Sequence, residues 1–202
     1  MEEQRAGVAD RRLERPIDPP RAGAPYTGIG SRATPSDVLT LMRQLAAQLA
    51  RRGWLLRTGI SPGADEAFFR GARAAGGGVE LYLPWPGFRV DVWADAAGQQ
   101  ARGLTAPTAA AHVLAARFHP DWPALAPRAR LLLARDGHEV LGADLASPSS
   151  FVVCWTADAG LDGSGVYSDG TGQALRIAHA YGIRVFNLAR PEQLRLMRDL
   201  PL

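Results

Sequence analysis

The sequence predicts an α/β protein whose sheet is mainly parallel and is covered by helices on both faces, as in a three-layer sandwich. Short apolar runs typical of buried strands alternate with segments of helical period through most of the chain. Several of these strands lead, directly or through a loop, into a glycine-rich turn that opens the next helix. In such sheets ligands bind at the carboxyl ends of the strands.

Length and composition predict one domain. The chain has 202 residues, of which 47% are hydrophobic, and we expect residues 25–202 to form a single domain. Residues 1–24 carry many charges and few large apolar side chains, which predicts a flexible N-terminal arm. No apolar run is long enough to cross a membrane, the N-terminus lacks a signal-peptide core, and Cys154 is the single cysteine. We therefore expect a cytoplasmic protein without a membrane partner or a disulfide framework.

The basic residues are all arginine. The 23 basic side chains include no lysine, and the formal net charge is +3. The absence of lysine excludes Schiff-base chemistry and a P-loop lysine. Arginine suits bidentate contacts to phosphate, although a charge of +3 is weak support for a nucleic-acid partner.

The first glycine-rich turn spans residues 25–35. A short strand ends in Gly28-Ile29-Gly30-Ser31-Arg32, and Pro35 suits the first position of a helix. Thr34 is the expected N-cap, with Asp37 bonding back to it. A helix N-terminus and an arginine beside flexible glycines suit an anion, most often a phosphate. The alternative is that this common turn binds nothing.

A second turn of the same kind follows the strand predicted at residues 54–58. Its sequence, Gly59-Ile60-Ser61-Pro62-Gly63-Ala64-Asp65, leads into a helix with small residues on one face. Asp65 either caps that helix, which we favour, or accepts hydrogen bonds from a ligand sugar or base. A third strand over residues 79–83 ends in Pro84-Trp85-Pro86-Gly87-Phe88, a loop that either stacks a base or plugs the end of the sheet.

The rest of the chain continues the alternation. We expect an irregular segment at residues 91–104, helices at 107–118 and 128–141, and an interruption of the second helix by its charged residues 135–138. A buried strand at 151–155 leads through a loop into the third turn, Gly170-Thr171-Gly172, which opens a helix reaching Tyr181. A strand at 183–188 and a helix at 191–200 complete the pattern.

Other chemistry has little support in the sequence. The four histidines have no zinc spacing, so we expect no metal site. Asp158, Asp162 and Asp169 either hold a divalent cation beside a phosphate or, as we favour, form loop turns. No Ser-His-Asp order stands out.

The three turns together resemble those of the SLOG superfamily, which joins the Rossmann-like domain of DNA-processing protein A (DprA/Smf) and the Lonely-Guy (LOG) phosphoribohydrolases. The resemblance covers residues 25–188 and is greatest to small DprA-like proteins of phages and bacteria, which carry a similar Leu-Pro-Trp-Pro-Gly-Phe loop. It implies a Rossmann-like fold, nucleotide or nucleic-acid binding, and pairing into a homodimer or higher oligomer.

Several positions depart from that pattern. Ile60 and Ser61 replace a small Gly-Ala pair, and β-branched Ile60 disfavours positive φ, so we expect a reshaped second turn. Asp169 stands where a glycine is usual, and Arg135-Asp136 stands where the pattern has Arg-Asn. The Lonely-Guy signature with its catalytic glutamate is missing, which argues against phosphoribohydrolase activity.

We expect a protein that binds a nucleotide or single-stranded nucleic acid through phosphates at the three turns, with no further cofactor required. The expected ligand-binding residues are Gly28, Gly30, Ser31, Arg32, Gly59, Pro62, Gly63, Ala64, Asp65, Gly170, Thr171 and Gly172. Two alternatives stay open: a hydrolase of nucleotides, with Asp65 or Asp169 as its carboxylate, and a non-catalytic structural partner.

Overall fold

The computed structural model describes residues 17, 21, 23–93, 101–165 and 170–200. Six parallel strands form one sheet in the order β4-β3-β2-β1-β5-β6. The strands are β1 (Pro25–Gly28), β2 (Leu55–Thr58), β3 (Val79–Tyr82), β4 (Ala101–Leu104), β5 (Phe151–Cys154) and β6 (Arg184–Asn187). The expected N-terminal arm, residues 1–24, lies almost entirely outside the described residues and stays a prediction.

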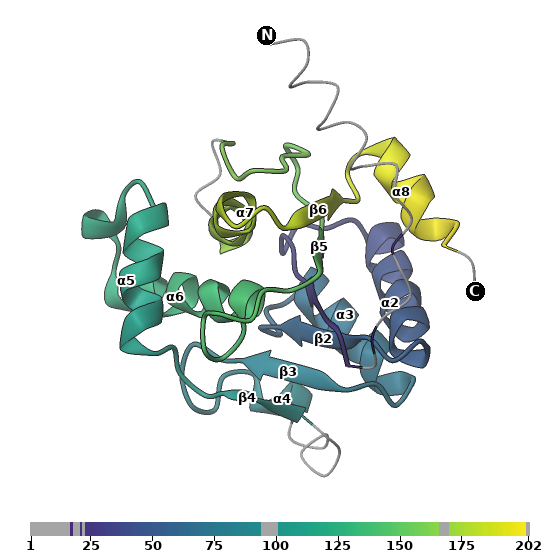
Figure 1. Cartoon of the computed structure of the whole chain (residues 1–202), viewed down its shortest axis with the longest axis horizontal. Coiled ribbons are helices and arrows are strands. Elements are labelled where there is room, and N and C mark those ends of the chain that lie inside the picture. Colours follow the sequence, from purple (N-terminus) through teal and green to yellow (C-terminus); the bar gives the residue numbers. More distant parts are fainter. Residues whose placement is uncertain (1–16, 18–20, 22, 94–100, 166–169, 201–202) are drawn as a thin grey trace, which may run out of the picture.

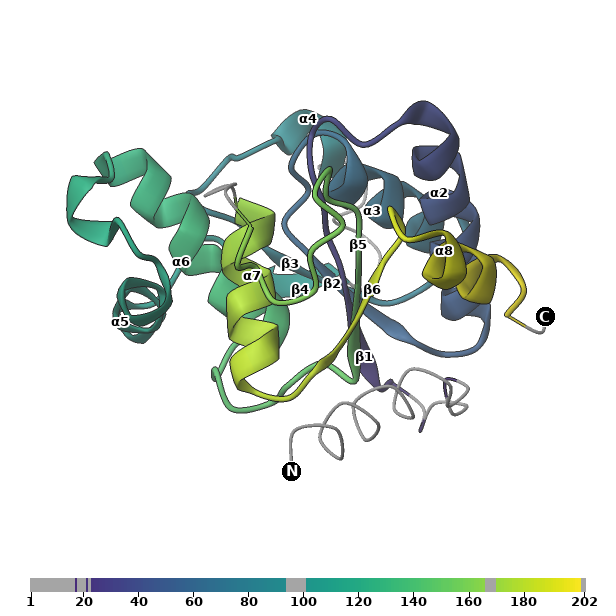
Figure 2. The ribbon, with the colours of Figure 1, turned by 90° about the horizontal axis from the view of Figure 1, so that it is seen from above.

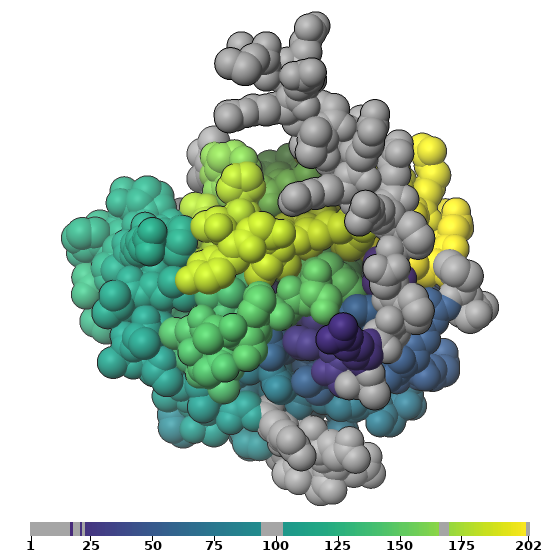
Figure 3. Space-filling view, viewed as in Figure 1, coloured from purple at the N-terminus to yellow at the C-terminus, as the bar shows by residue number. Residues whose placement is uncertain are grey.

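Helices cover both faces of the sheet (Figures 1 and 2). On one face lie α2 (Ser36–Arg51), α3 (Ala64–Ala74), the short α4 (Val90–Trp93) and α8 (Pro191–Arg198). On the other face lie α6 (Pro127–Leu141) and α7 (Gly170–Ala180). The helix α5 (Ala109–Phe118), with the 3-10 turn Trp122–Ala124 after it, packs outside α6 and forms one flank of the molecule (Figure 3). The expected three-layer sandwich is confirmed.

Alternation along the central strands builds two cores. In β1, Tyr26 points into the core shared with α2 and α3, whereas Thr27 contacts α6 on the opposite face. In β5, Phe151 and Val153 join the first core, and Val152 joins the core under α6 and α7. This two-residue period is that of a strand buried on both faces.

The strand order reverses between β1 and β5. The chain leaves β1 toward α2 on one face, and it leaves β5 toward α7 on the other. A crevice at the carboxyl ends of the strands is expected at such a switch point. The fold therefore places the first and third glycine-rich turns at the same edge.

Two expectations about the elements are wrong. Residues 91–104 are not irregular throughout, because they contain α4 and the edge strand β4, which pairs with β3 along its length. The charged residues 135–138 do not interrupt α6, which is continuous from Pro127 to Leu141. In the described part of the chain, no helix is long and apolar enough to span a membrane.

Candidate functional site

A pocket of about 430 Å³ opens at the carboxyl ends of the central strands. Segments from all three turns and from α6 line it: Ile29, Gly30, Ser31, Arg32, Ala33, Ser61, Asp65, Leu125, Ala129, Leu132, Leu133, Arg135, Asp136, Glu139, Gly170 and Thr171. The volume lies within the range of small-molecule sites. The structure thus brings together residues that the sequence places far apart.

The first turn contributes Gly30, Ser31 and Arg32 to the pocket. Its backbone continues to pair beyond the strands, since the Ser31 N–H donates to the Trp155 carbonyl over 3.1 Å. The Arg32 side chain is exposed, and within the described residues no hydrogen bond or ion pair ties its guanidinium. Arg32 is therefore available to an anion at the rim of the pocket.

Two expectations about the first turn need correction. Gly28 lies in β1 and does not line the pocket. It faces the core, where an added Cβ would lie 2.6 Å from the Phe68 ring. Thr34 does not cap α2. The N-cap of this helix is Pro35, and no side chain makes a capping hydrogen bond there. The Thr34 hydroxyl instead donates to the Ser31 carbonyl over 2.7 Å. Thr34 therefore closes the turn rather than the helix.

Asp65 joins the first two turns. One carboxylate oxygen accepts from the Gly30 N–H at 3.1 Å, and the other accepts from the Ser61 N–H at 3.2 Å. The expected capping role is wrong in its detail, since the N-cap of α3 is Gly63, without a side-chain cap, and Asp65 lies inside the helix. The carboxylate fixes the two turns against each other.

Two backbone positions of the second turn are unusual. Gly63 has φ +95°, and a Cβ there would lie 2.9 Å from the Ser31 carbonyl oxygen, so only glycine lets the two turns meet. Ile60 also adopts positive φ, +52°, despite its β-branched side chain, which is fully buried. Such a conformation is strained and persists only where the surroundings impose it. Pro62 is exposed and Ala64 is buried against Gly30, and neither lines the pocket.

The third turn contributes Gly170 and Thr171, while Asp169 lies outside the described residues. Gly172 faces a smaller neighbouring cavity of about 260 Å³, which also touches Ser31 and Asp158. A Cβ added at Gly170 would lie 3.4 Å from Asp136 Oδ2. The start of α7 thus already faces a carboxyl group of the chain, which a helix N-terminus stabilises.

A buried charge cluster forms the floor of the pocket. Arg135, Asp136, Glu139 and Asp65 are 5%, 1%, 1% and 3% exposed. The Arg135 guanidinium donates to the Gly59 carbonyl at 3.0 Å and to Asp136 Oδ1 at 3.2 Å. Its nitrogens also lie 3.5 Å from Glu139 and 3.9 Å from Asp65. If ionised together, three carboxylates and one guanidinium would leave two net negative charges.

Burial perturbs the acids of this cluster. Desolvation raises the pKa of Glu139 to about 7, against the opposing attraction of Arg135. Desolvation also raises the pKa of Asp136 well above its usual value, and it raises the pKa of Asp65 even though Arg135 and two backbone N–H groups favour its charged form. The cluster therefore holds protons at a pH where exposed acids hold none.

Gly59 supports Arg135 rather than lining the pocket. A Cβ on Gly59 would overlap the Arg135 guanidinium and the Glu139 carboxyl. The glycine is required because the two groups approach the backbone this closely.

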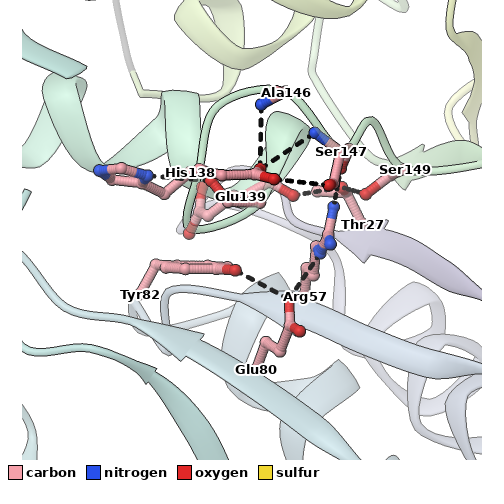
Figure 4. A network of polar contacts seen from close by, with 11 residues as sticks. Thr27, Arg57, Glu80, Tyr82, His138, Glu139, Ala146, Ser147 and Ser149 are labelled. Atoms are coloured by element: carbon pink, nitrogen blue, oxygen red, sulfur yellow. Dashed lines mark hydrogen bonds and ion pairs between the residues drawn. The ribbon is translucent and has the colours of Figure 1, made fainter. Parts of the chain in front are cut away.

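A second polar network holds α6 against the strands (Figure 4). The Thr27 hydroxyl of β1 contacts the Glu139 carbonyl at 2.6 Å and the Ser149 hydroxyl at 2.8 Å. Arg57 of β2 forms an ion pair of 2.7 Å with Glu80. The ion pair joins β2 to β3, whereas the Thr27 contact ties α6 to β1 at Glu139 itself.

The Pro84–Phe88 loop does not line the pocket. Trp85 packs edge-on against Phe88, with ring centroids 5.0 Å apart, and the Arg128 guanidinium of α6 lies 4.6 Å from the Trp85 ring centroid. Stacking on a bound base stays a prediction, and the observed contacts hold the loop against the start of α6.

Sequence reasoning noted Arg135 and Asp136 only as an interruption of α6 and as a departure from the family pattern, and it missed Glu139 altogether. The available signal was that these three charged residues stand in a helix whose neighbouring turns are apolar. Among the described residues, no group of histidine, cysteine or acidic side chains could hold a metal ion.

Comparison with known proteins identifies the fold. No family model matches the chain, and no curated protein matches it. The solved molybdenum cofactor carrier protein MCP from Chlamydomonas reinhardtii is 21% identical, with 89% of this chain and 85% of that chain covered and a TM-score of 0.52. DNA processing protein A from Streptococcus pneumoniae matches at 12% identity over 81% of this chain and 58% of that chain, with a TM-score of 0.40. The chain has the Rossmann-like fold that its resemblance to the SLOG superfamily implies.

Proposed function

We propose that the pocket binds a nucleotide, with its phosphate at Gly30, Ser31 and Arg32. The observation that carries this proposal is the convergence of all three glycine-rich turns on one cavity of about 430 Å³. Arg32 supplies a guanidinium with no partner among the described residues, and guanidinium groups bind phosphate through two parallel, charge-assisted bonds. No further cofactor is required for this binding.

Replacing Arg32 tests the proposal. Arg32→Ala removes hydrogen bonds to a charged group, each typically ~1.5–3 kcal/mol, so nucleoside monophosphates should bind about 10- to 100-fold more weakly. Because Arg32 is exposed, the unfolding free energy without ligand should change by less than about 0.5 kcal/mol. Titration calorimetry and melting curves measure the two quantities.

The matched control is Arg51→Ala, which removes another exposed arginine at the opposite end of α2. This variant should bind as the wild type does. Equal affinity of the Arg32→Ala variant and wild type would remove Arg32 from the site. A variant that lost stability and kept its affinity would show that Arg32 only supports the loop.

A single-stranded nucleic acid is the second form that the ligand could take. The apolar wall formed by Leu125, Ala129, Leu132 and Leu133 bounds the cavity beside α6 and favours a mononucleotide. Titration with short oligonucleotides distinguishes the two forms. One structural neighbour is the molybdenum cofactor carrier protein from Chlamydomonas reinhardtii, so the molybdenum cofactor should be titrated as a further ligand.

One specific observation favours the alternative that the protein is a nucleotide hydrolase. Glu139 lines the pocket with a pKa raised to about 7 by burial, which suits a general acid that protonates a departing base. Of the carboxylates expected from the sequence, Asp65 is held by two backbone N–H groups. Incubation with nucleoside monophosphates and NAD, followed by analysis for free base, tests the hydrolase. Release by wild type and not by Glu139→Gln would support it.

We also propose that the protein forms a homodimer or higher oligomer. Val113 of α5 is 73% exposed, and Tyr181 after α7 is 48% exposed. Trp122, which follows α5, is half-buried beside His112, with ring centroids 6.2 Å apart, and adds little open apolar surface. The support therefore comes from α5 and from the resemblance.

A further inference from the structure

The floor of the pocket holds carboxyl oxygens that the described part of the chain leaves without a hydrogen-bond partner. These atoms are Asp136 Oδ2 and Glu139 Oε1, on side chains that are each 1% exposed. Glu139 Oε1 has only an ion-pair contact of 3.5 Å with Arg135 Nε, and the two carboxyl groups share a hydrogen bond only while one of them is protonated. Buried polar atoms are nearly always hydrogen-bonded, and an unmade bond is costly. Because both residues line the pocket, a ligand that donates hydrogen bonds could satisfy them.

The same face of α6 carries an apolar surface next to these acids. Leu132 and Leu133 precede Asp136 by four and three residues, so they lie one turn away on the same side of the helix. Ala129 and Leu125 continue the surface toward the outside. A flat aromatic ring lying along this surface would bring its edge to Asp136.

The charges divide the pocket into two ends. Arg32 stands at the first turn, whereas the acids of α6 stand at the floor, close to Gly170 at the start of α7. A phosphate at the third turn would meet the Asp136 carboxyl. The phosphate is therefore better placed at the first turn, and the part of the ligand that reaches the floor should donate hydrogen bonds.

We propose that Asp136 and Glu139 bind the edge of a nucleobase that carries two adjacent N–H donors, as guanine does with its N1–H and its 2-amino group. This inference rests on the proposed function, in which the other end of the pocket holds the phosphate. Asp136 Oδ1 already accepts from Arg135, so the two N–H groups would go to the two remaining oxygens, one to Asp136 Oδ2 and one to Glu139 Oε1. Adenine presents an acceptor nitrogen at the corresponding edge, and hypoxanthine lacks the amino group.

Titration calorimetry of the full chain with GMP, IMP, AMP and 2′-deoxy-GMP tests the inference. We expect IMP to bind about 10- to 100-fold more weakly than GMP, the loss expected for one bond to a charged acceptor, and AMP more weakly still. The 2′-deoxy-GMP should bind as GMP does. A pterin carries the same donor pair, so neopterin monophosphate serves as a separate arm that distinguishes the two ring systems.

Variants locate the contact. Asp136→Asn should reduce the preference for GMP over IMP at least tenfold, whereas Glu192→Gln, an exposed acid on α8, should leave it unchanged. The comparison of ligands on wild-type protein needs no variant and holds even if Asp136→Asn folds poorly.

The outcomes separate this inference from the proposed function. Equal binding of GMP, IMP and AMP would overturn the inference and keep the nucleotide site. Loss of affinity for 2′-deoxy-GMP without loss for IMP would assign the acids to the ribose and overturn it too. Binding of none of these nucleotides would overturn the proposed function itself and the inference with it.

Discussion

At the scale of single residues, Arg135 is the cation that holds the three acids of the pocket floor together. Its guanidinium lies against Asp65, Asp136 and Glu139 and also donates to the Gly59 carbonyl, all in surroundings nearly closed to water. Buried charge clusters add little stability as a whole, but removing one partner leaves uncompensated charge. Arg135 is thus more important for the stability of the cluster than any single acid.

We expect Arg135→Met to lower the unfolding free energy by about 3–5 kcal/mol, the usual effect of breaking a buried ion pair. The methionine fills much of the space of the arginine stem but leaves the three carboxyls without their cation. Urea denaturation measures the change, and Arg51→Met on the surface is the control. A change below about 1 kcal/mol would contradict the proposed importance of the cation.

The raised pKa of Glu139 predicts a pH dependence of stability. Its pKa is about 7 in the folded protein and near 4.5 in the unfolded chain. The folded state therefore holds the proton more tightly, and the unfolding free energy should fall as pH rises from about 4.5 to 7. In Glu139→Gln this contribution disappears. As pH rises from about 4.5 to 7, the unfolding free energy of the variant should therefore increase relative to that of wild type by roughly 1–3 kcal/mol.

Melting temperatures from pH 4.5 to 8 check this prediction. The lowered pKa of His138 acts in the opposite direction, because its burial favours the neutral ring and stabilises the fold as pH rises. His138 is present in both proteins, so its contribution cancels when the melting temperatures of wild type and Glu139→Gln are compared. Parallel curves for the two proteins would show that Glu139 titrates normally.

At the scale of elements, α6 lines the pocket and α5 packs against α6 from outside. Alanines from both helices pack together in a small cluster, Ala111, Ala115 and Ala134. Thr108 caps α5 by accepting from the Ala111 N–H at 3.2 Å, and its hydroxyl and N–H also lie 3.2 Å from His138 Nε2 of α6. One threonine therefore both begins α5 and ties it to α6.

Thr108→Ala should lower the unfolding free energy by about 1–2 kcal/mol, at the upper part of the range for a lost N-cap. Thr40→Ala is the control: its exposed hydroxyl bonds back to the Ser36 carbonyl within α2, and its loss should change stability by less than about 0.5 kcal/mol. Urea denaturation of both variants gives the comparison. Equal effects of the two substitutions would show that Thr108 has no special role.

At the scale of the whole molecule, the sheet carries the site and the flanks remain open to partners. The pocket lies beside the central strands, where the strand order reverses, and α5 stands apart on one flank (Figure 2). Val113 on α5 is the most exposed large apolar side chain among the described residues. An association through this flank would cover it without closing the pocket.

Light scattering at high protein concentration should therefore give a mass of at least twice 21.6 kDa. Val113→Asp should shift the population toward the monomer, because a charge in an apolar contact is costly. Its stability as a monomer should stay close to that of wild type, since the side chain is 73% exposed. A wild-type monomer of 21.6 kDa would overturn the proposed oligomer.

The sequence by itself determined the fold class and the edge of the sheet where the site lies. Buried parallel strands read as continuous apolar runs, and all of them end at the same edge, so the three turns had to converge. The edge strand β4 escaped this reasoning because Ala101-Arg102-Gly103-Leu104 has no apolar pattern and forms a strand only by pairing with β3.

Only the tertiary structure decided what the pocket is made of. Arg135 meets Gly59 across 76 residues of sequence, and Asp65 joins Gly30 to Ser61 instead of capping its own helix. Spacing along the chain predicts which residues share a helix face, but not which distant backbone that face meets. The acids of α6 became part of the site because the packing of that helix on β1 and β2 buries them at the ends of the strands.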